Sequence, residues 1–203
     1  MVIKVCGMRE AENIRAVEEL GVQWLGLIFW SKSSRYVAMP PAYLPTRAKR
    51  IGVFVDAPID EVMQHVTDYG LHAVQLHGKE SPEYVRECKN AQCAIIKAFN
   101  IATPADLKQT EPYEGLVDYF LFDTKGPSVG GNGTQFDWTV LNAYHGTTPF
   151  LLSGGIGPDD VPRIRSFSHP QQAGIDLNSR FELAPGLKDV NAITRFLKEL
   201  QAP

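Results

Sequence analysis

The 203-residue sequence is poor in cysteine, and its cysteines lack the spacing that would give them a structural role. Cys6, Cys88 and Cys93 are an odd number and include no Cys-x-x-Cys pair. This pattern argues against a disulfide framework and against a zinc site, and it favours a reducing compartment. We therefore expect a cytoplasmic protein without a bound metal.

Long apolar runs and an excess of positive charge are also missing. No window approaches the roughly 18 apolar residues of a membrane span, and the N-terminus has no charged leader followed by an apolar stretch. The net charge of −3 provides no basic field for nucleic acid. No low-complexity linker divides the chain, so we expect a single domain over residues 1–203 that binds neither membranes nor nucleic acid.

Short apolar runs recur along the whole chain at fairly even intervals. Near-continuous apolar runs are typical of parallel strands that are covered on both faces. Apolar residues at helical spacing lie between several of them, most clearly over Glu10–Leu20, Ile59–Tyr69 and Val190–Leu200. The repeated strand-plus-helix unit predicts an α/β protein with a compact (βα)8 barrel, and an open doubly wound sheet is the alternative. The expected strands are Val2–Cys6, Trp24–Phe29, Arg50–Val55, Ala73–Leu76, Ala94–Ala98, Tyr119–Asp123, Pro149–Ser153 and Ala173–Leu177.

Cys6 ends the first apolar run, and Gly7 follows it. A barrel places its chemistry at the C-terminal ends of its strands, so this thiol belongs at the active rim. Free cysteine is also among the most buried residue types, and a packed core thiol is the second interpretation. Lys4 and Cys6 share one face of the strand, and a lysine below the thiol would favour a thiolate base. Residue type alone leaves base and filler open.

The last two strand ends have the features of an anion site. Gly154 and Gly155 follow the seventh run, and paired glycines let backbone N–H groups approach an anion closely. Asn178 and Ser179 follow the eighth run and are good N-caps for a short extra helix, whose free N–H groups favour an anion. Barrels often bind phosphate with these two loops. We expect a phosphorylated small molecule here, and two ordinary turns are the alternative.

Two further charged residues lie after predicted strands. Asp123 ends an apolar strand, where a carboxylate is costly unless it is used or paired, although it could simply cap neighbouring N–H groups. A glycine-rich stretch, Gly130–Gly133, follows and can fold over a ligand. Arg35 lies in the loop after the second run, where its guanidinium could bind a carboxylate or remain a solvated surface group. His77 follows the fourth run, and its role is open between structure and function.

Short motifs follow one another along nearly the whole chain: Ile3–Arg9, Ser34–Tyr36, Val53–Val55, Val74–Gly78, Phe122–Lys125, Gly130–Gly133, Phe136–Trp138, Leu152–Gly155, Gly174–Ser179 and Pro185–Asp189. Each motif is modest, but the ordered set is specific. Together they resemble the phosphoribosylanthranilate isomerase family of tryptophan biosynthesis. The resemblance implies a (βα)8 barrel without a metal or organic cofactor. It also implies an Amadori rearrangement of N-(5'-phosphoribosyl)anthranilate to the 1-(2-carboxyphenylamino)-1-deoxyribulose 5-phosphate.

The same resemblance implies a role for each site residue. Cys6 would be the general base and Asp123 the general acid. Arg35 would hold the anthranilate carboxylate, and Asp176 would line the site near the anthranilate amine. The phosphate would be held by Gly154, Gly155, Asn178 and Ser179.

One position departs from the pattern, and two competing functions stay in view. Many family members have Ser-Gly where this chain has Ser179-Arg180, which bears on how closely the backbone there approaches phosphate. The related histidine-pathway isomerase typically has aspartate where this chain has Cys6. A catalytically silent barrel that binds a phosphorylated ligand is the other competitor, and the joint presence of Cys6 and Asp123 speaks against it. Monomer and homodimer are both left open.

Overall fold

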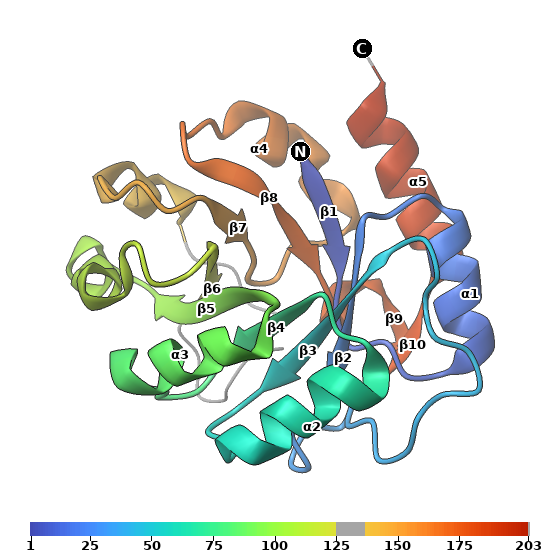
Figure 1. The fold of residues 1–203 in the computed structure, drawn as a ribbon. Coiled ribbons are helices and arrows are strands. Elements are labelled where there is room, and N and C mark those ends of the chain that lie inside the picture. The colour runs from blue at the N-terminus through green and yellow to red at the C-terminus, as the bar shows by residue number, and fades with distance from the viewer. Residues whose placement is uncertain (125–136, 203) are drawn as a thin grey trace.

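The computed structural model describes residues 1–124 and 137–202. Eight parallel strands pair in chain order, and β8 closes the barrel against β1 (Figure 1). This closure confirms the (βα)8 barrel and excludes an open sheet. The strands are β1 (Val2–Val5), β2 (Trp24–Ile28), β3 (Lys49–Phe54), β4 (Ala73–Leu76), β5 (Ala94–Ile101), β6 (Tyr119–Thr124), β7 (Phe150–Leu152) and β8 (Gln172–Leu177).

The helices lie outside the barrel, and a short antiparallel ribbon follows β8. The three helices expected from spacing are present, with ends that differ by at most one residue. No helix in the described residues is long and apolar enough to cross a membrane. The α-helices are α1 (Ala11–Glu19), α2 (Ile59–Tyr69), α3 (Pro82–Cys88), α4 (Val161–Ser166) and α5 (Val190–Gln201). The 3-10 helices are η1 (Lys89–Ala91), η2 (Pro104–Tyr113), η3 (Trp138–Ala143), η4 (Pro158–Asp160) and η5 (Ser179–Phe181), and the ribbon is β9 (Glu182–Ala184) with β10 (Leu187–Lys188).

The expectation of a helix after every strand is wrong after β2. Residues 29–48 form a long loop without a helix. Pro40, Pro41 and Pro45 interrupt this segment, and proline removes a backbone donor and clashes with the preceding turn of a helix. Glu18 of α1 holds the loop instead, because its carboxylate accepts hydrogen bonds from the backbone N–H groups of residues 46–48 at 2.7–2.9 Å.

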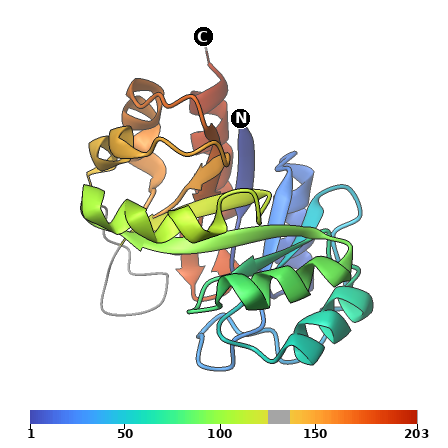
Figure 2. The same cartoon turned by 60° about the vertical axis from the view of Figure 1, so that its left-hand side comes forward.

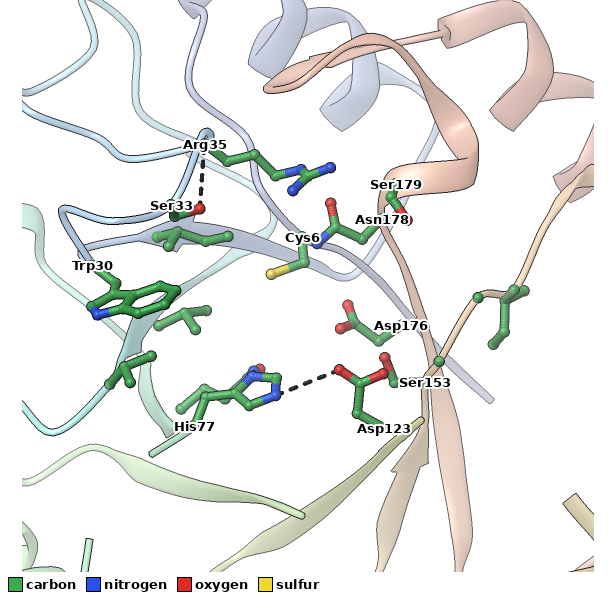
Figure 3. A pocket seen from close by; sticks show the side chains of 17 residues that line it. Cys6, Trp30, Ser33, Arg35, His77, Asp123, Ser153, Asp176, Asn178 and Ser179 are labelled. Atoms are coloured by element: carbon green, nitrogen blue, oxygen red, sulfur yellow. Dashed lines mark hydrogen bonds and ion pairs between the residues drawn. The ribbon is translucent and has the colours of Figure 1, made fainter. Parts of the chain in front are cut away.

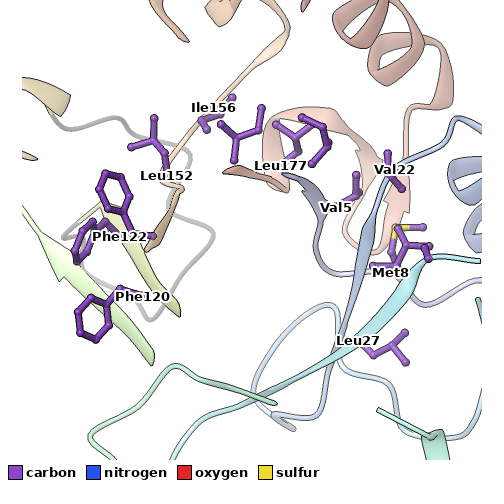
Figure 4. Packing of buried hydrophobic residues seen from close by; sticks show 14 of the residues in the cluster. Val5, Met8, Val22, Leu27, Phe120, Phe122, Leu152, Ile156 and Leu177 are labelled. Carbon is purple, nitrogen blue, oxygen red and sulfur yellow. The ribbon is translucent and has the colours of Figure 1, made fainter. Parts of the chain in front are cut away.

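Side chains alternate between the two faces of each strand, and this alternation separates core from site. Ile3 and Val5 of β1 pack in the large outer core between barrel and helices, part of which Figure 4 shows. Lys4 and Cys6 therefore point into the lumen, as expected from the strand period. The bottom of the lumen is filled by an apolar layer of Trp24, Ile51, Ala73, Ile96, Ala98, Leu121 and Leu151.

Both described ends of the chain lie at the N-terminal end of the barrel (Figure 2). α5 packs against α1 and α4, which closes the outer layer beside β1. The C-terminal strand ends, where the polar residues gather, are therefore left to the loops and to the β9–β10 ribbon.

Candidate active site

A pocket opens at the C-terminal end of the barrel (Figure 3). Its walls come from strands and loops far apart in the sequence, and Ile28, Val53 and Trp30 form its apolar side. The structure brings together in this pocket all eight residues that the sequence analysis assigned to the site: Cys6, Arg35, Asp123, Gly154, Gly155, Asp176, Asn178 and Ser179.

Lys4 lies below Cys6 and forms a buried ion pair across two neighbouring strands. Its Nζ is 3.0 Å from Oδ1 of Asp176, and the two residues are aligned in the register of β1 and β8. Lys4 is fully buried and Asp176 is 6% exposed. Burial opposes the charge of Lys4, but Asp176 and Cys6 outweigh it and raise the pKa of Lys4 above its ordinary value. Burial also raises the pKa of Asp176, although Lys4 opposes this rise.

The thiol of Cys6 is buried at the pocket wall, and Gly26 of β2 makes room for it. A Cβ added at Gly26 would lie 2.8 Å from Sγ. Burial raises the pKa of the Cys6 thiol, and the charge of Lys4 only partly offsets this effect. The charge of Lys4 acts in favour of the thiolate, but desolvation outweighs this attraction, and the hypothesis that Lys4 makes Cys6 a base stays a prediction.

Asp123 of β6 lies across the lumen from Cys6, with β7 and β8 between their strands. Its Oδ1 accepts a hydrogen bond from the backbone N–H of Thr124 at 2.8 Å, so part of the expected capping role is real. Its Oδ2 lies 3.5 Å from Nε2 of His77. The other ring nitrogen of His77 is 3.0 Å from the side-chain amide of Gln75. The ring of His77 therefore lies beside the carboxylate of Asp123 and forms no hydrogen bond with the thiol of Cys6.

Arg35 is held at the pocket by a partner that sequence reasoning missed. Its Nε and Nη2 bond to Glu182 of β9, with Nη2 2.6 Å from Oε2. The side chain of Arg35 is 14% exposed, so it is not a solvated surface group. Burial opposes the charge of Glu182, but Arg35 and Lys188 lower its pKa below the usual range.

Lys188 of β10 is the second residue that sequence reasoning missed. It is 1% exposed, and its Nζ lies 2.6 Å from Oε1 of Glu182 and 2.7 Å from Oδ1 of Asn178. Burial lowers the pKa of Lys188 despite the neighbouring carboxylate. The motif Pro185–Asp189 contained this lysine, but nothing in its local spacing shows which way the side chain points.

The two loops expected to bind an anion face the same pocket, with one correction. Gly154 and Gly155 have φ angles of +86° and +69°, which favour glycine. Asn178 precedes η5, but its side chain makes no capping hydrogen bond, because its Oδ1 accepts from Lys188. The expected extra helix is a 3-10 turn of only three residues.

The side chain of Arg180 lies beside the far end of the loop that follows β7. Arg180 is exposed, and its side chain runs beside Gly157, where an added Cβ would lie 2.7 Å from Nε. The glycine-rich stretch Gly130–Gly133 lies outside the described residues. Among the residues that are described, no group of three or more His, Cys, Asp or Glu side chains could hold a metal ion.

Sequence comparison gives the chain a family. The family model described as N-(5'phosphoribosyl)anthranilate (PRA) isomerase matches residues 3–199. An N-(5'-phosphoribosyl)anthranilate isomerase of Phocaeicola vulgatus is 51% identical over 201 residues, which cover 99% of this chain and 98% of the relative. The protein of the same name from Parabacteroides distasonis is 48% identical and covers 100% of this chain and 95% of its own length.

Solved structures agree with the sequence comparison. A phosphoribosyl anthranilate isomerase from Thermotoga maritima superimposes with a TM-score of 0.83 at 29% identity, covering 99% of both chains. A phosphoribosyl anthranilate isomerase in complex with reduced 1-(o-carboxyphenylamino)-1-deoxyribulose 5-phosphate has a TM-score of 0.81 at 28% identity, again covering 99% of both chains. The chain therefore belongs to the N-(5'-phosphoribosyl)anthranilate isomerase family.

Proposed function

We propose that this chain converts N-(5'-phosphoribosyl)anthranilate into 1-(2-carboxyphenylamino)-1-deoxyribulose 5-phosphate, an aldose–ketose isomerisation in L-tryptophan biosynthesis, with Cys6 as general base and Asp123 as general acid. Family membership supports the reaction. One observation carries the residue roles: a buried thiol and a buried carboxyl face each other across a single pocket at the C-terminal end of the barrel.

Each catalytic role follows from the position of its group. Asp123 donates a proton to the furanose ring oxygen, and the ring opens to a cationic imine. The thiolate of Cys6 then removes the proton from C2 of the sugar, which gives an enolamine that tautomerises to the ketone. Acid and base have to act on different flanks of the sugar, and β6 and β1 are separated around the lumen by β7 and β8.

The binding roles distribute the carboxylate, the amine and the phosphate of the substrate around the pocket. Arg35 binds the anthranilate carboxylate through Nη1, which no described residue occupies while Glu182 takes Nε and Nη2. Asp176 lies near the anthranilate amine. The phosphate binds between the loops after β7 and β8, and its ligands are Gly154, Gly155, Asn178 and Ser179.

The direct test is turnover by the purified chain. The fluorescence of the anthranilate adduct should fall with time when the enzyme is added, and we expect EDTA to leave the rate unchanged, since the family resemblance implies a reaction without a metal. Binding of the adduct without its consumption would instead favour the catalytically silent barrel. Turnover of a histidine-pathway aminoaldose in its place would favour the related isomerase.

The remaining properties follow from this assignment as inferences. We infer a single domain, because one closed barrel contains eight of the ten strands of the described residues and α5 packs back against α1 and α4. We infer a cytoplasmic enzyme, since Cys6, Cys88 and Cys93 are all free thiols. Monomer and homodimer stay open, and sedimentation of the purified chain would decide between them.

A further inference from the structure

The buried ammonium group of Lys4 lies near two groups, Asp176 and Cys6, whose anionic forms it stabilises. Lys4 is fully buried, with its Nζ 3.0 Å from Oδ1 of Asp176. Cys6 lies two residues further along the chain on the same lumen face, and the charges of both Cys6 and Asp176 act on Lys4. A single lysine cannot neutralise two buried anions, so the charges of Asp176 and Cys6 compete for it.

We propose that Lys4 is a shared counter-ion: it stabilises the Asp176 carboxylate before substrate binds and the thiolate of Cys6 once a substrate cation lies beside Asp176. The proposal rests on the reaction proposed above, in which ring opening creates a cationic imine at the amine nitrogen. Lys4 is thus a positioning residue, which acts through Cys6 and Asp176.

The charges around Cys6 favour the protonated thiol before substrate binds. Burial and the Asp176 carboxylate both raise the pKa of Cys6, and together they outweigh the attraction of Lys4. When the imine cation pairs with Asp176, the negative field at Sγ is neutralised while the field of Lys4 remains. The S–H bond then breaks, its electron pair stays on sulfur, and the proton passes to water in the open pocket. The thiolate base therefore forms only after the substrate ring has opened to the imine cation.

No other charged group described near Lys4 and Asp176 could act as a counter-ion to both Asp176 and Cys6. Lys188 of β10 and Arg35 of the β2–β3 loop also act on Cys6, but both are bonded to Glu182. Asp123 of β6 and His77, which follows β4, act on Asp176. Among the described residues, Lys4 is the one cation that acts on Cys6 and also forms an ion pair with Asp176.

Alkylation of Cys6 tests the sharing without turnover. The Asp176→Asn variant removes the carboxylate charge but keeps an oxygen that can accept from Lys4. Iodoacetamide should therefore alkylate Cys6 in this variant about tenfold faster at pH 7 than in the unmodified chain, which corresponds to a fall of about one unit in the thiol pKa. Mass spectrometry of the peptides measures the rate, and Cys93 in the same molecules is the reference.

Two controls separate the proposal from a general effect of charge. The Asp123→Asn variant removes a carboxylate from the same pocket that does not bond to Lys4, and it should change the Cys6 rate by less than about twofold. The Lys4→Met/Asp176→Asn double variant should not show the faster alkylation of Cys6 that is expected in Asp176→Asn. An unchanged rate in Asp176→Asn, an equal gain in Asp123→Asn or a gain that survives Lys4→Met would each overturn the proposal.

The design remains decisive if a variant misfolds, and it does not depend on the assigned reaction. Circular dichroism checks each variant; should the double variant unfold, the comparison of Asp176→Asn with Asp123→Asn still decides. The Lys4→Arg variant should retain most of the activity, because it keeps the cation. A chain that alkylates as expected but does not turn over the anthranilate adduct would refute the proposed function alone, whereas an active chain without the alkylation pattern would refute the role of Lys4 alone.

Discussion

Glu182 bonds to Arg35 along one edge of the guanidinium, through Nε at 2.9 Å and Nη2 at 2.6 Å. Lys188 binds the same carboxylate at 2.6 Å. Two cations therefore share one carboxylate beside the pocket, and the group carries one excess positive charge. That excess suits a substrate anion, and the bidentate contact fixes Arg35 before the anion arrives.

Replacing Arg35 should separate binding from chemistry. We expect Arg35→Ala to raise KM at least about tenfold while kcat changes by less than about threefold, because the carboxylate loses a charged partner remote from the reacting atoms. Arg35→Lys keeps the charge but loses the planar donor edge, and its KM should lie between those of the unmodified chain and Arg35→Ala. Steady-state kinetics on the anthranilate adduct measures both constants. An unchanged KM in Arg35→Ala would remove this residue from the carboxylate site.

Removing the proposed acid or base should lower kcat and leave substrate binding nearly unchanged, which is the reverse of the effect expected for Arg35→Ala. Cys6→Ala and Asp123→Asn should each lower kcat by roughly 10²–10⁴-fold, the usual contribution of one proton-transfer group. Substrate affinity should change little, because neither group is assigned to a charged part of the substrate. Single-turnover kinetics with a separate binding titration distinguishes the two effects. Near-normal kcat in Cys6→Ala would refute the base assignment.

The loop after β7 provides a matched pair of glycine substitutions. Gly154 and Gly21 have similar φ angles, +86° and +80°, so alanine at either position costs about 1–2 kcal/mol of backbone strain. A Cβ at Gly21 meets nothing within 4 Å, whereas at Gly154 it would lie 2.6 Å from the backbone N of Thr124. We expect Gly154→Ala to be the less stable variant in thermal unfolding and also to raise KM. Gly21→Ala should leave KM unchanged, and equal effects of the two would contradict a phosphate role for this loop.

The contribution of the loop after β2 to the stability of the fold should depend on pH, because the carboxylate of Glu18 holds this loop. Burial opposes the charge of Glu18, but hydrogen bonds from Tyr43 and from the backbone of residues 46–48 lower its pKa. A carboxylate with a lowered folded pKa adds stability that is fully present above its unfolded pKa of about 4.3 and is lost as the pH falls through the folded pKa.

Glu18→Gln should therefore lower the free energy of unfolding by roughly 1.5–3 kcal/mol at pH 7, since it removes hydrogen bonds to a charged acceptor. The difference from the unmodified chain should shrink below about pH 4. Urea unfolding at several pH values measures this. Glu19→Gln, a change at the exposed neighbour, is the control and should have little effect. A constant difference across the pH range would contradict the role of the carboxylate.

The strands could be predicted closely because their pattern is local. Apolar runs placed all eight strands, and β4 was predicted with its observed ends. The largest error was at β5, which continues through Asn100 to Ile101 because these residues pair with Asp123 and Thr124 of β6. The predicted run ended at Ala98, and the pairing with β6 accounts for the three further residues.

The side-chain partners of the site could not be predicted in the same way. Asn178 looked like a helix cap, but in the fold Lys188 takes its side-chain oxygen. Glu182 had no local pattern that marked it as the partner of Arg35, from which it is separated by 147 positions. Such contacts depend on how the β9–β10 ribbon folds back over the barrel.

The sequence by itself determined the barrel, the face of β1 that carries Lys4 and Cys6, and the set of residues that gather at the rim, because strand period and parallel pairing follow from local order. The tertiary structure decided which charges meet. Lys4 and Asp176 are 172 positions apart, and barrel closure brings β8 against β1 to pair them. The fold likewise decided that the Cys6 thiol has a raised pKa, because desolvation depends on what packs around sulfur and not on which residues are its neighbours in the chain.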